Sequence, residues 1–149
     1  MTGARIPIFC RERVLEAKHI DQLGHVNNLA WIRLTLELAD AHATALGFGY
    51  EALRARGFVW VVRHQDLHYE QSAFLGERLR ETTWLSELRG ARCVRHARFR
   101  SERGALCFAA NTEWAFVDVA KLRARRIPAD LRAAFELVSR EAGEAAERP

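Results

Sequence analysis

Residues 29–46 read LAWIRLTLELADAHATAL, and Gly47 follows them directly. Apolar residues lie almost all the way round the helix that this stretch predicts. Only Arg33, Glu37 and Asp40 form a polar line along it, at positions i, i+4 and i+7. Glycine after the last apolar position is typical of a helix end. Because a helix this apolar has to be buried on most of its sides, other elements are expected to wrap around it.

The rest of the chain predicts mainly strands. Apolar residues either run continuously or alternate with polar ones over residues 9–17, 58–69, 79–88, 93–100 and 106–116. Short turn sequences separate the last three of these segments, and strands joined by tight turns pair antiparallel. A flat sheet would leave the apolar helix in water. We therefore predict an α+β fold in which a curved antiparallel sheet wraps a long buried helix.

The length of 149 residues favours a single domain that spans residues 1–149. A last helix is expected near Pro128, because proline is tolerated in the first turn of a helix. Residues 137–149 form a polar tail rich in alanine and glutamate, which we expect to fray.

Cysteine usage and the apolar runs indicate the compartment. Cys10, Cys93 and Cys107 are odd in number, far apart and without metal-ligand spacing, which favours a reducing, cytoplasmic environment. No apolar run is long enough to span a membrane, and charged residues interrupt residues 1–13. We therefore expect no membrane span, no secretory signal, no metal site and no cofactor.

The net charge of +4 is modest, but the basic residues are unevenly distributed. Lys18 and Lys121 are the only lysines, and arginines are dense between residues 89 and 103. Arginine makes bidentate contacts with phosphates and carboxylates. On this ground a phosphorylated small molecule, a nucleic acid and a merely solvated strand face all remain open.

Polar and glycine positions cluster just before the apolar helix, at Asp21, Gly24, His25, Asn27 and Asn28. The unpaired N–H groups and partial positive charge of a helix N-terminus can hold a developing oxyanion. A carboxylate beside them can act as a general base or a nucleophile. The pattern therefore indicates a catalytic loop. The alternative is structural, with an asparagine cap, a glycine turn and an aspartate bonded to local backbone.

The sequence DQLGHVNN at residues 21–28 resembles the signature of the hotdog-fold acyl thioesterases of the 4-hydroxybenzoyl-CoA thioesterase-like group. That group includes acyl-acyl-carrier-protein thioesterases. The likeness extends over residues 10–135. It implies the hotdog fold, in which a curved antiparallel sheet wraps a long helix. It also implies a homodimer or homotetramer with active sites between subunits.

The resemblance also implies roles for the loop residues. Asp21 would be the catalytic carboxylate, as general base or nucleophile. The N-terminus of the helix that starts near Leu29 would be the oxyanion site, with the N–H near Asn28 binding the thioester oxygen. His25 and Asn27 would position the substrate or the water.

Four further residues are expected to bind substrate. Gly24 belongs to the motif, and Trp31 stands where the family often has a tyrosine, so it offers an apolar wall without a hydroxyl. Arg89 and Arg92 would contact the phosphates of coenzyme A or the acidic face of a carrier protein.

Other ionisable residues have structural alternatives. Glu37 and Asp40 could supply a carboxylate from the helix, or could pair with Arg33 one turn away. His64 and His68 lack a third ligand at metal spacing, so a surface or interface role is favoured.

We predict an enzyme that hydrolyses an acyl-CoA or acyl-carrier-protein thioester. The alternative is a non-catalytic hotdog module that binds acyl-CoA or an acyl chain. A nucleic-acid partner is disfavoured, because the basic excess is small and no recognition motif is present.

Overall fold

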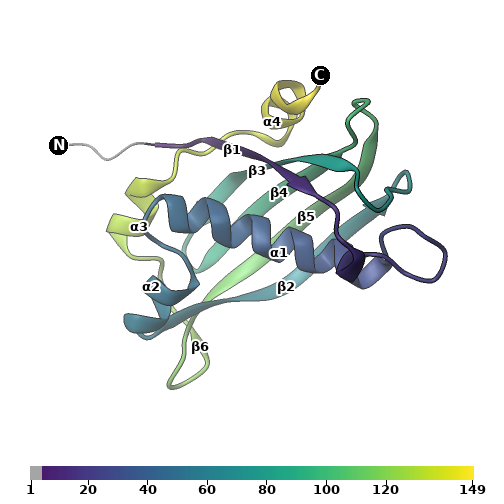
Figure 1. Cartoon of the computed structure of the whole chain (residues 1–149). Coiled ribbons are helices and arrows are strands. Elements are labelled where there is room, and N and C mark those ends of the chain that lie inside the picture. The colour runs from purple at the N-terminus through teal and green to yellow at the C-terminus, as the bar shows by residue number, and fades with distance from the viewer. Residues whose placement is uncertain (1–4) are drawn as a thin grey trace.

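The computed structural model of the chain describes residues 5–149. One long helix lies in the hollow of a curved sheet (Figure 1). The elements are β1 (Ile8–Val14), the short 3-10 helix η1 (Ala17–His19), α1 (Asn28–Ala45), α2 (Tyr50–Ala55), β2 (Phe58–Tyr69), β3 (Arg78–Arg89), β4 (Arg92–Arg100), β5 (Leu106–Asp118), β6 (Arg123–Ala124), α3 (Ala129–Ala134) and α4 (Arg140–Glu147). Over residues 5–149, no helix is both long enough and apolar enough to cross a membrane.

The sheet is antiparallel throughout, in the order β1-β3-β4-β5-β2, with β6 paired to β5. The tight turns after β3 and β4 form the hairpins that the sequence predicts. β1 lies at one edge of the sheet and β2 at the other. The prediction of an α+β fold with a curved antiparallel sheet around a long helix is confirmed.

Helix α1 ends in a glycine cap. Gly47 has a φ of +88°, and the N–H groups of Gly47 and Phe48 donate to the carbonyls of Thr44 and Ala43. This is a Schellman arrangement, in which glycine adopts the left-handed conformation without strain. The helix therefore stops at the glycine that marks its end in the sequence.

The burial of α1 differs from the expectation. Leu34 and Leu38 are fully buried against the sheet, whereas Leu29 and Leu36 are 76% and 38% exposed. The prediction that α1 is buried on most of its sides is therefore wrong for a single chain. The sheet covers only the side of α1 that faces it. An apolar strip of α1 remains in contact with solvent.

Two apolar clusters fill the space between α1 and the sheet. The first contains Trp31, Leu38 and Phe99. The second lies near the C-terminal end of α1 and includes Leu53 of α2 and Leu131 of α3. The sequence analysis does not predict α2, which closes this end of the fold together with α3.

The polar tail forms helix α4, so the expectation that residues 137–149 fray is wrong. Helix α4 packs on the face of the sheet away from α1 (Figure 1). Gly143 lies directly against the ring of Trp84. The absence of a side chain at Gly143 allows this close approach.

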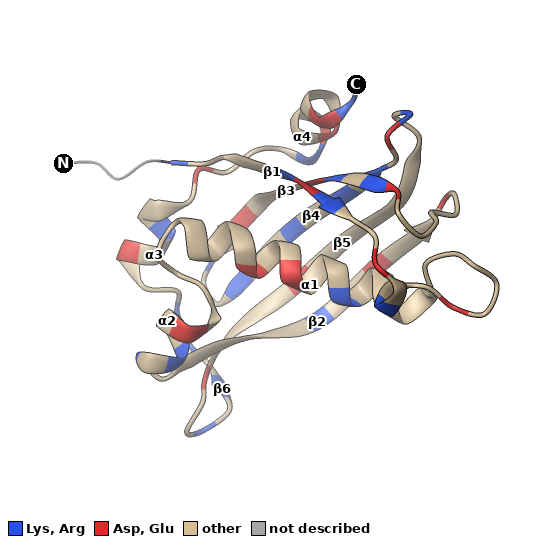
Figure 2. Ribbon diagram, viewed as in Figure 1, with Lys and Arg blue, Asp and Glu red and all other residues tan. Residues whose placement is uncertain are grey.

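Ion pairs complete the packing of α4. Glu144 bonds to Arg98 at 3.0 Å, and Glu147 bonds to Arg100 at 2.6 Å. Figure 2 shows these acidic positions of α4 beside the basic strands. The glutamates that make the tail look frayed in the sequence therefore pair with arginines on this face of the sheet.

Replacing Gly143 with alanine should loosen α4, although alanine is the better helix former by about 1 kcal/mol. The added Cβ would overlap the Trp84 ring. We expect Gly143→Ala to lower Tm and to speed amide hydrogen exchange over residues 140–147. Ala145→Ser, at an exposed position of the same helix, should change exchange much less. Unchanged protection in Gly143→Ala would contradict this packing.

Candidate functional site

The loop between η1 and α1 is a closed turn. Ile20 and Val26 form an isolated antiparallel bridge, and the N–H of Asp21 donates to the carbonyl of His25 at 3.0 Å. Gly24 has a φ of +85°, and a Cβ there would meet no atom within 4 Å. Glycine is therefore required by the backbone of the turn. A contact of Gly24 with substrate stays a prediction.

The turn presents Asp21 and His25 together at the surface. Oδ1 of Asp21 accepts the N–H of Leu23 at 2.8 Å, and Oδ2 lies 4.0 Å from Nδ1 of His25. The two side chains are 31% and 32% exposed. One carboxylate oxygen is fixed by the backbone, and the other has no hydrogen-bond partner within residues 5–149. The second oxygen is thus available for chemistry beside the imidazole.

Exposed apolar side chains lie on or next to this turn. Leu23, Leu29, Phe74 and Leu75 are between 45% and 77% exposed. Phe74 is bridged to His25 through the backbone, and its ring stands edge-on to the imidazole at 6.1 Å between centroids. Clustered exposed apolar groups mark surfaces that bind ligands or partners. The sequence analysis misses Phe74 and Leu75, which lie far from the motif in the chain.

Helix α1 begins at Asn28, and Asn27 is its N-cap. Oδ1 of Asn27 accepts the N–H of Ala30 at 2.8 Å, which confirms the capping alternative for this residue. The N–H groups of Asn28 and Leu29 have no acceptor within residues 5–149, as is usual in a first helical turn. These groups offer a site for negative charge a few residues after Asp21.

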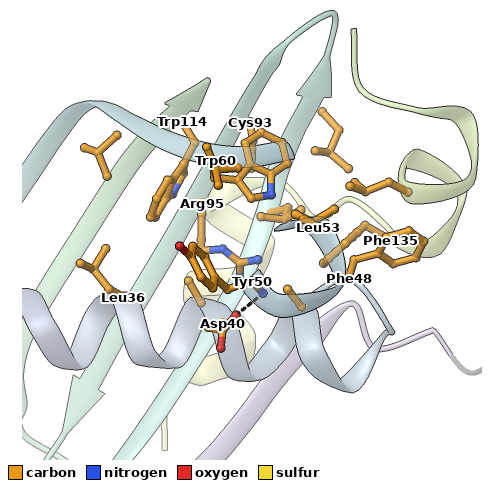
Figure 3. Close-up of a pocket in the computed structure, with 17 residues that line it drawn as sticks. Leu36, Asp40, Phe48, Tyr50, Leu53, Trp60, Cys93, Arg95, Trp114 and Phe135 are labelled. Atoms are coloured by element: carbon orange, nitrogen blue, oxygen red, sulfur yellow. Dashed lines mark hydrogen bonds between the residues drawn. The ribbon is translucent and has the colours of Figure 1, made fainter. Parts of the chain in front are cut away.

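A cavity of about 270 Å³ lies at the other end of α1, between this helix, α2 and the concave face of the sheet (Figure 3). The lining is mostly apolar and aromatic, and it includes Leu36, Phe48, Tyr50, Trp60, Trp114 and Phe135. The volume is close to the lower end of the range for small-molecule pockets. Because its residues come from separate segments, only the fold brings them together.

A charged side chain, Arg95 of β4, forms part of the cavity wall and is 7% exposed. Its Nη1 donates to Nδ1 of His42 at 2.9 Å and to Oγ1 of Thr83 at 3.0 Å. Burial lowers the pKa of Arg95 to about 10, so the guanidinium stays protonated near neutral pH. The cavity wall therefore carries a positive charge.

His42 of α1 supports Arg95 as a neutral imidazole. Nε2 of His42 lies 2.7 Å from the carbonyl of Ile6 and so carries the proton, while Nδ1 accepts from Arg95. The ring stacks on Phe9 and meets Phe135 edge-on. Burial, followed by the Arg95 charge, lowers the pKa of His42 to about 4.

A comparison with protein families matches residues 15–135 to the thioesterase-like superfamily. This chain belongs to that superfamily. The matched residues contain the Asp21 turn, α1 and strands β2 to β5. The resemblance to hotdog-fold thioesterases is confirmed, and the curved sheet around α1 is a hotdog fold.

Solved structures share the fold of this thioesterase-like chain. A DHNA-CoA thioesterase from Staphylococcus aureus is 19% identical with a TM-score of 0.75, over 80% of each chain. A Staphylococcus aureus protein in complex with CoA is 11% identical, with a TM-score of 0.80 over 100% of this chain and 90% of that one. An acyl-ACP thioesterase from Bacteroides thetaiotaomicron is 18% identical with a TM-score of 0.76. The match covers 90% of this chain but spans only 56% of that enzyme. A comparison with curated proteins gives no match.

Trp31 lies in the core of the thioesterase-like fold. It is 3% exposed, stacks on Phe108 at 5.1 Å between ring centroids and meets Phe99 edge-on. The expectation that Trp31 forms a substrate wall is therefore wrong for this arrangement, because its ring points between α1 and the sheet.

Arg89 and Arg92 stand at the hairpin between β3 and β4. The Asp21 turn lies near the opposite end of β3, where Phe74 is bridged to His25, so a single chain does not bring these groups together. Arg92 is paired with Glu87 and Glu113, whereas Arg89 is exposed. A phosphate contact through Arg89 stays a prediction, and Arg92 would first have to leave its carboxylates.

The carboxylates of α1 have structural partners. Glu37 pairs with Arg13 of β1 at 3.0 Å, which is a structural role but with a partner other than Arg33. Oδ1 of Asp40 accepts the N–H of Tyr50 at 2.7 Å, which holds the start of α2 (Figure 3).

The histidines of β2 lie on its surface. His68 bonds to Asp66 at 2.9 Å, and Asn111 donates to the same carboxylate at 3.0 Å. These hydrogen bonds lower the pKa of Asp66. Over residues 5–149 no group of three or more His, Cys, Asp or Glu side chains is placed to hold a metal ion.

The sequence analysis misses the cavity and Arg95, although one signal could have shown this arginine. Cys93, Ala97 and Phe99 alternate along β4 and face α1, and Arg95 falls in the same alternation. Among the arginines of β4, Arg95 is therefore the one whose side chain lies on the face of the sheet toward α1.

The capping role of Asn27 can be tested through stability. Asn27→Ala removes the acceptor for the N–H of Ala30, and we expect a loss of about 1 kcal/mol in the free energy of unfolding. Asn27→Asp keeps an acceptor at the same place and should cost much less. Urea unfolding at neutral pH measures both. Equal losses in the two variants would contradict the cap.

The neutral imidazole of His42 predicts a loss of stability in acid. Its folded pKa of about 4 lies below the ordinary value of 6.5, so the unfolded chain takes up the proton first. The stabilisation is full above about pH 6.5 and falls as the pH drops toward 4. Between pH 7 and 5, the wild type should lose about 1–2 kcal/mol more than His42→Gln. Urea unfolding at both pH values tests this, and equal slopes would contradict it.

Proposed function

We propose that this protein hydrolyses an acyl-CoA or acyl-carrier-protein thioester, with Asp21 as the catalytic carboxylate. The main support for this proposal is the position of the Asp21 carboxylate. It is partly exposed and lies in the turn that leads directly to the N-terminus of α1. Membership of the thioesterase-like superfamily supports the reaction class. A DHNA-CoA thioesterase and an acyl-ACP thioesterase with the same fold support the two forms of substrate.

In the general-base route, Oδ2 of Asp21 takes a proton from water as the water oxygen attacks the thioester carbonyl carbon. The resulting oxyanion accepts hydrogen bonds from the free N–H groups of Asn28 and Leu29 at the positive end of α1. Collapse breaks the carbon–sulfur bond, and the thiolate takes the proton from Asp21. The products are the free acid and the thiol. His25 would orient the water, and its Nδ1 at 4.0 Å from Oδ2 of Asp21 supports this role.

In the nucleophilic route, Oδ2 of Asp21 attacks the thioester carbon itself and expels the thiolate. Water then cleaves the mixed anhydride and restores the carboxylate. Both routes use the same oxygen, because Oδ1 is held by the N–H of Leu23. They also use the same helix terminus for the oxyanion.

A second copy of the chain would complete the site. β2 is an edge strand on which Val61, Val62 and Tyr69 are exposed. Leu29 and Leu36, seven residues apart on one face of α1, are exposed as well. A two-fold pairing of two β2 edges would cover these apolar groups and remove the open edge. A homodimer, alone or within a homotetramer, follows from this pairing.

The distance along α1 between the Asp21 turn and the cavity is the reason to propose a site shared between two copies of the chain. Asn28 and Asp40 are about 18 Å apart at the rise of an α-helix, so Asp21 lies far from the cavity of its own chain. The Tyr69 end of β2 leads to the Asp21 turn, and its Phe58 end lies beside the cavity. Antiparallel pairing of two β2 strands would set the Asp21 turn of one copy beside the cavity of its partner.

We place this activity in the cytoplasm. Cys10, Cys93 and Cys107 are all free thiols in the structure. Burial raises the pKa of Cys93 to about 12, so this thiol is inert packing and not a nucleophile. Unpaired cysteines are usual in a reducing compartment.

Removing the charge of Asp21 should abolish most of the hydrolysis. We expect Asp21→Asn to lower kcat/KM at least about a hundredfold with Tm nearly unchanged, since it deletes the base or nucleophile at a surface turn. Release of free thiol from a panel of acyl-CoAs measures the activity. Glu37→Gln, the same change at an exposed carboxylate of α1, is the matched control and should stay active.

Two results would count against the proposal. An Asp21→Asn variant with wild-type turnover would remove Asp21 from the mechanism. Thermal stabilisation by acyl-CoA without any thiol release would favour the non-catalytic binding module. Sedimentation of the active protein tests the shared site, because a fully active monomer is incompatible with it.

A further inference from the structure

The cavity contains a cation that the protein itself does not neutralise. The guanidinium of Arg95 is buried, and its Nη1 bonds to the imidazole of His42 and the hydroxyl of Thr83. Both partners are uncharged at neutral pH. In the sheet, Arg95 stands opposite Leu85 on one side and Thr112 on the other, which are uncharged as well.

The nearby carboxylates are occupied elsewhere. No carboxylate of residues 5–149 lies within 4.0 Å of Arg95. Asp40 also lines the cavity, but it is exposed at the rim and caps the N–H of Tyr50. Glu81, which is fully buried, is bound by Arg11 and Arg13. The positive charge therefore stands without a counter-ion.

An uncompensated buried charge is costly, and pairing it with an anion recovers much of the cost. Nη1 is engaged, whereas Nη2 and Nε bond to no residue of the range 5–149. Figure 3 shows Arg95 among the side chains that line the cavity, which include the aromatic residues Tyr50, Trp60 and Trp114. A guanidinium with free donors binds a carboxylate with short, charge-assisted hydrogen bonds.

We propose that Arg95 binds a carboxylate at the far end of the acyl group, so that the substrates are thioesters of short dicarboxylic acids. This inference rests on the proposed thioesterase function and specifies its substrate class. In this proposal the apolar walls contact the methylene chain, and Arg95 supplies the counter-ion for its terminal carboxylate. A cavity of about 270 Å³ suits a short acyl group.

The test compares thioesters that differ only at the distal end of the chain. Adipyl-CoA, hexanoyl-CoA and the ω-hydroxy analogue of hexanoyl-CoA form one matched set, and suberyl-CoA with octanoyl-CoA forms a longer pair. One of the two carboxylated thioesters, adipyl-CoA or suberyl-CoA, will fit the cavity better. For that thioester we expect the wild type to show a kcat/KM roughly tenfold or more above that of the neutral thioesters of the same chain length. Equal rates for the carboxylated and neutral members would overturn the inference.

Variants then assign the preference to Arg95. Arg95→Met keeps length and apolar packing, and it should lose the preference while neutral thioesters are still hydrolysed. Arg95→Lys keeps a cation and should retain part of the preference, which a purely structural role of the arginine would not produce. Preference for the carboxylated thioester that survives in Arg95→Met would overturn the assignment. The comparison of carboxylated and neutral thioesters uses the wild-type protein alone, so it still tests the inference if the Arg95 variants do not fold.

A binding measurement separates this inference from the proposed function. If no thioester of the acyl-CoA panel or of an acyl-carrier protein is hydrolysed, the proposed function fails. Thermal shifts of the protein with adipyl-CoA and hexanoyl-CoA still test carboxylate binding by Arg95 in that case. A larger rise in Tm of the wild type with adipyl-CoA, absent in Arg95→Met, supports carboxylate binding. Equal shifts with both ligands overturn it.

Discussion

The packing of one side of α1 against the curved sheet positions every other element of this fold. Leu34 and Leu38 are fully enclosed there, and a fully buried leucine contributes about 1.5–3 kcal/mol. The asparagine cap at Asn27 and the glycine cap at Gly47 fix the two ends of the helix against this contact. The Asp21 turn and the cavity are held at opposite ends of the same helix as a result.

The same packing leaves an apolar strip of α1 and one edge of the sheet uncovered in a single chain. The sheet covers only one side of α1, so Leu29 and Leu36 stay exposed, and β2 is left as an open edge of the sheet. The catalytic carboxylate that we propose and the cavity with Arg95 are then separated by most of the length of the helix. The two-fold pairing that we propose would cover the apolar strip and would bring the Asp21 turn of one copy beside the cavity of the other.

Sequence reasoning succeeds where the signal is local. Glycine at the end of α1, asparagine at its start and the polar residues around Asp21 all act on neighbouring backbone, so their spacing predicts the turn and the helix. It fails where the partner is distant. The polar tail is stabilised by Trp84 and the arginines of β4, and the arginine at position 95 is inward-facing only once the register of the sheet is set.

The α+β class, the antiparallel hairpins, the long helix and the loop with Asp21 can all be predicted from the sequence, because periodicity and capping depend on residues close together in the chain. The core position of Trp31, the ordered helix α4 and the cavity lined by buried Arg95 become visible only in the folded chain. The physical reason is that enclosure and charge pairing depend on residues far apart in the chain, whose contacts exist only after the sheet has curved around α1.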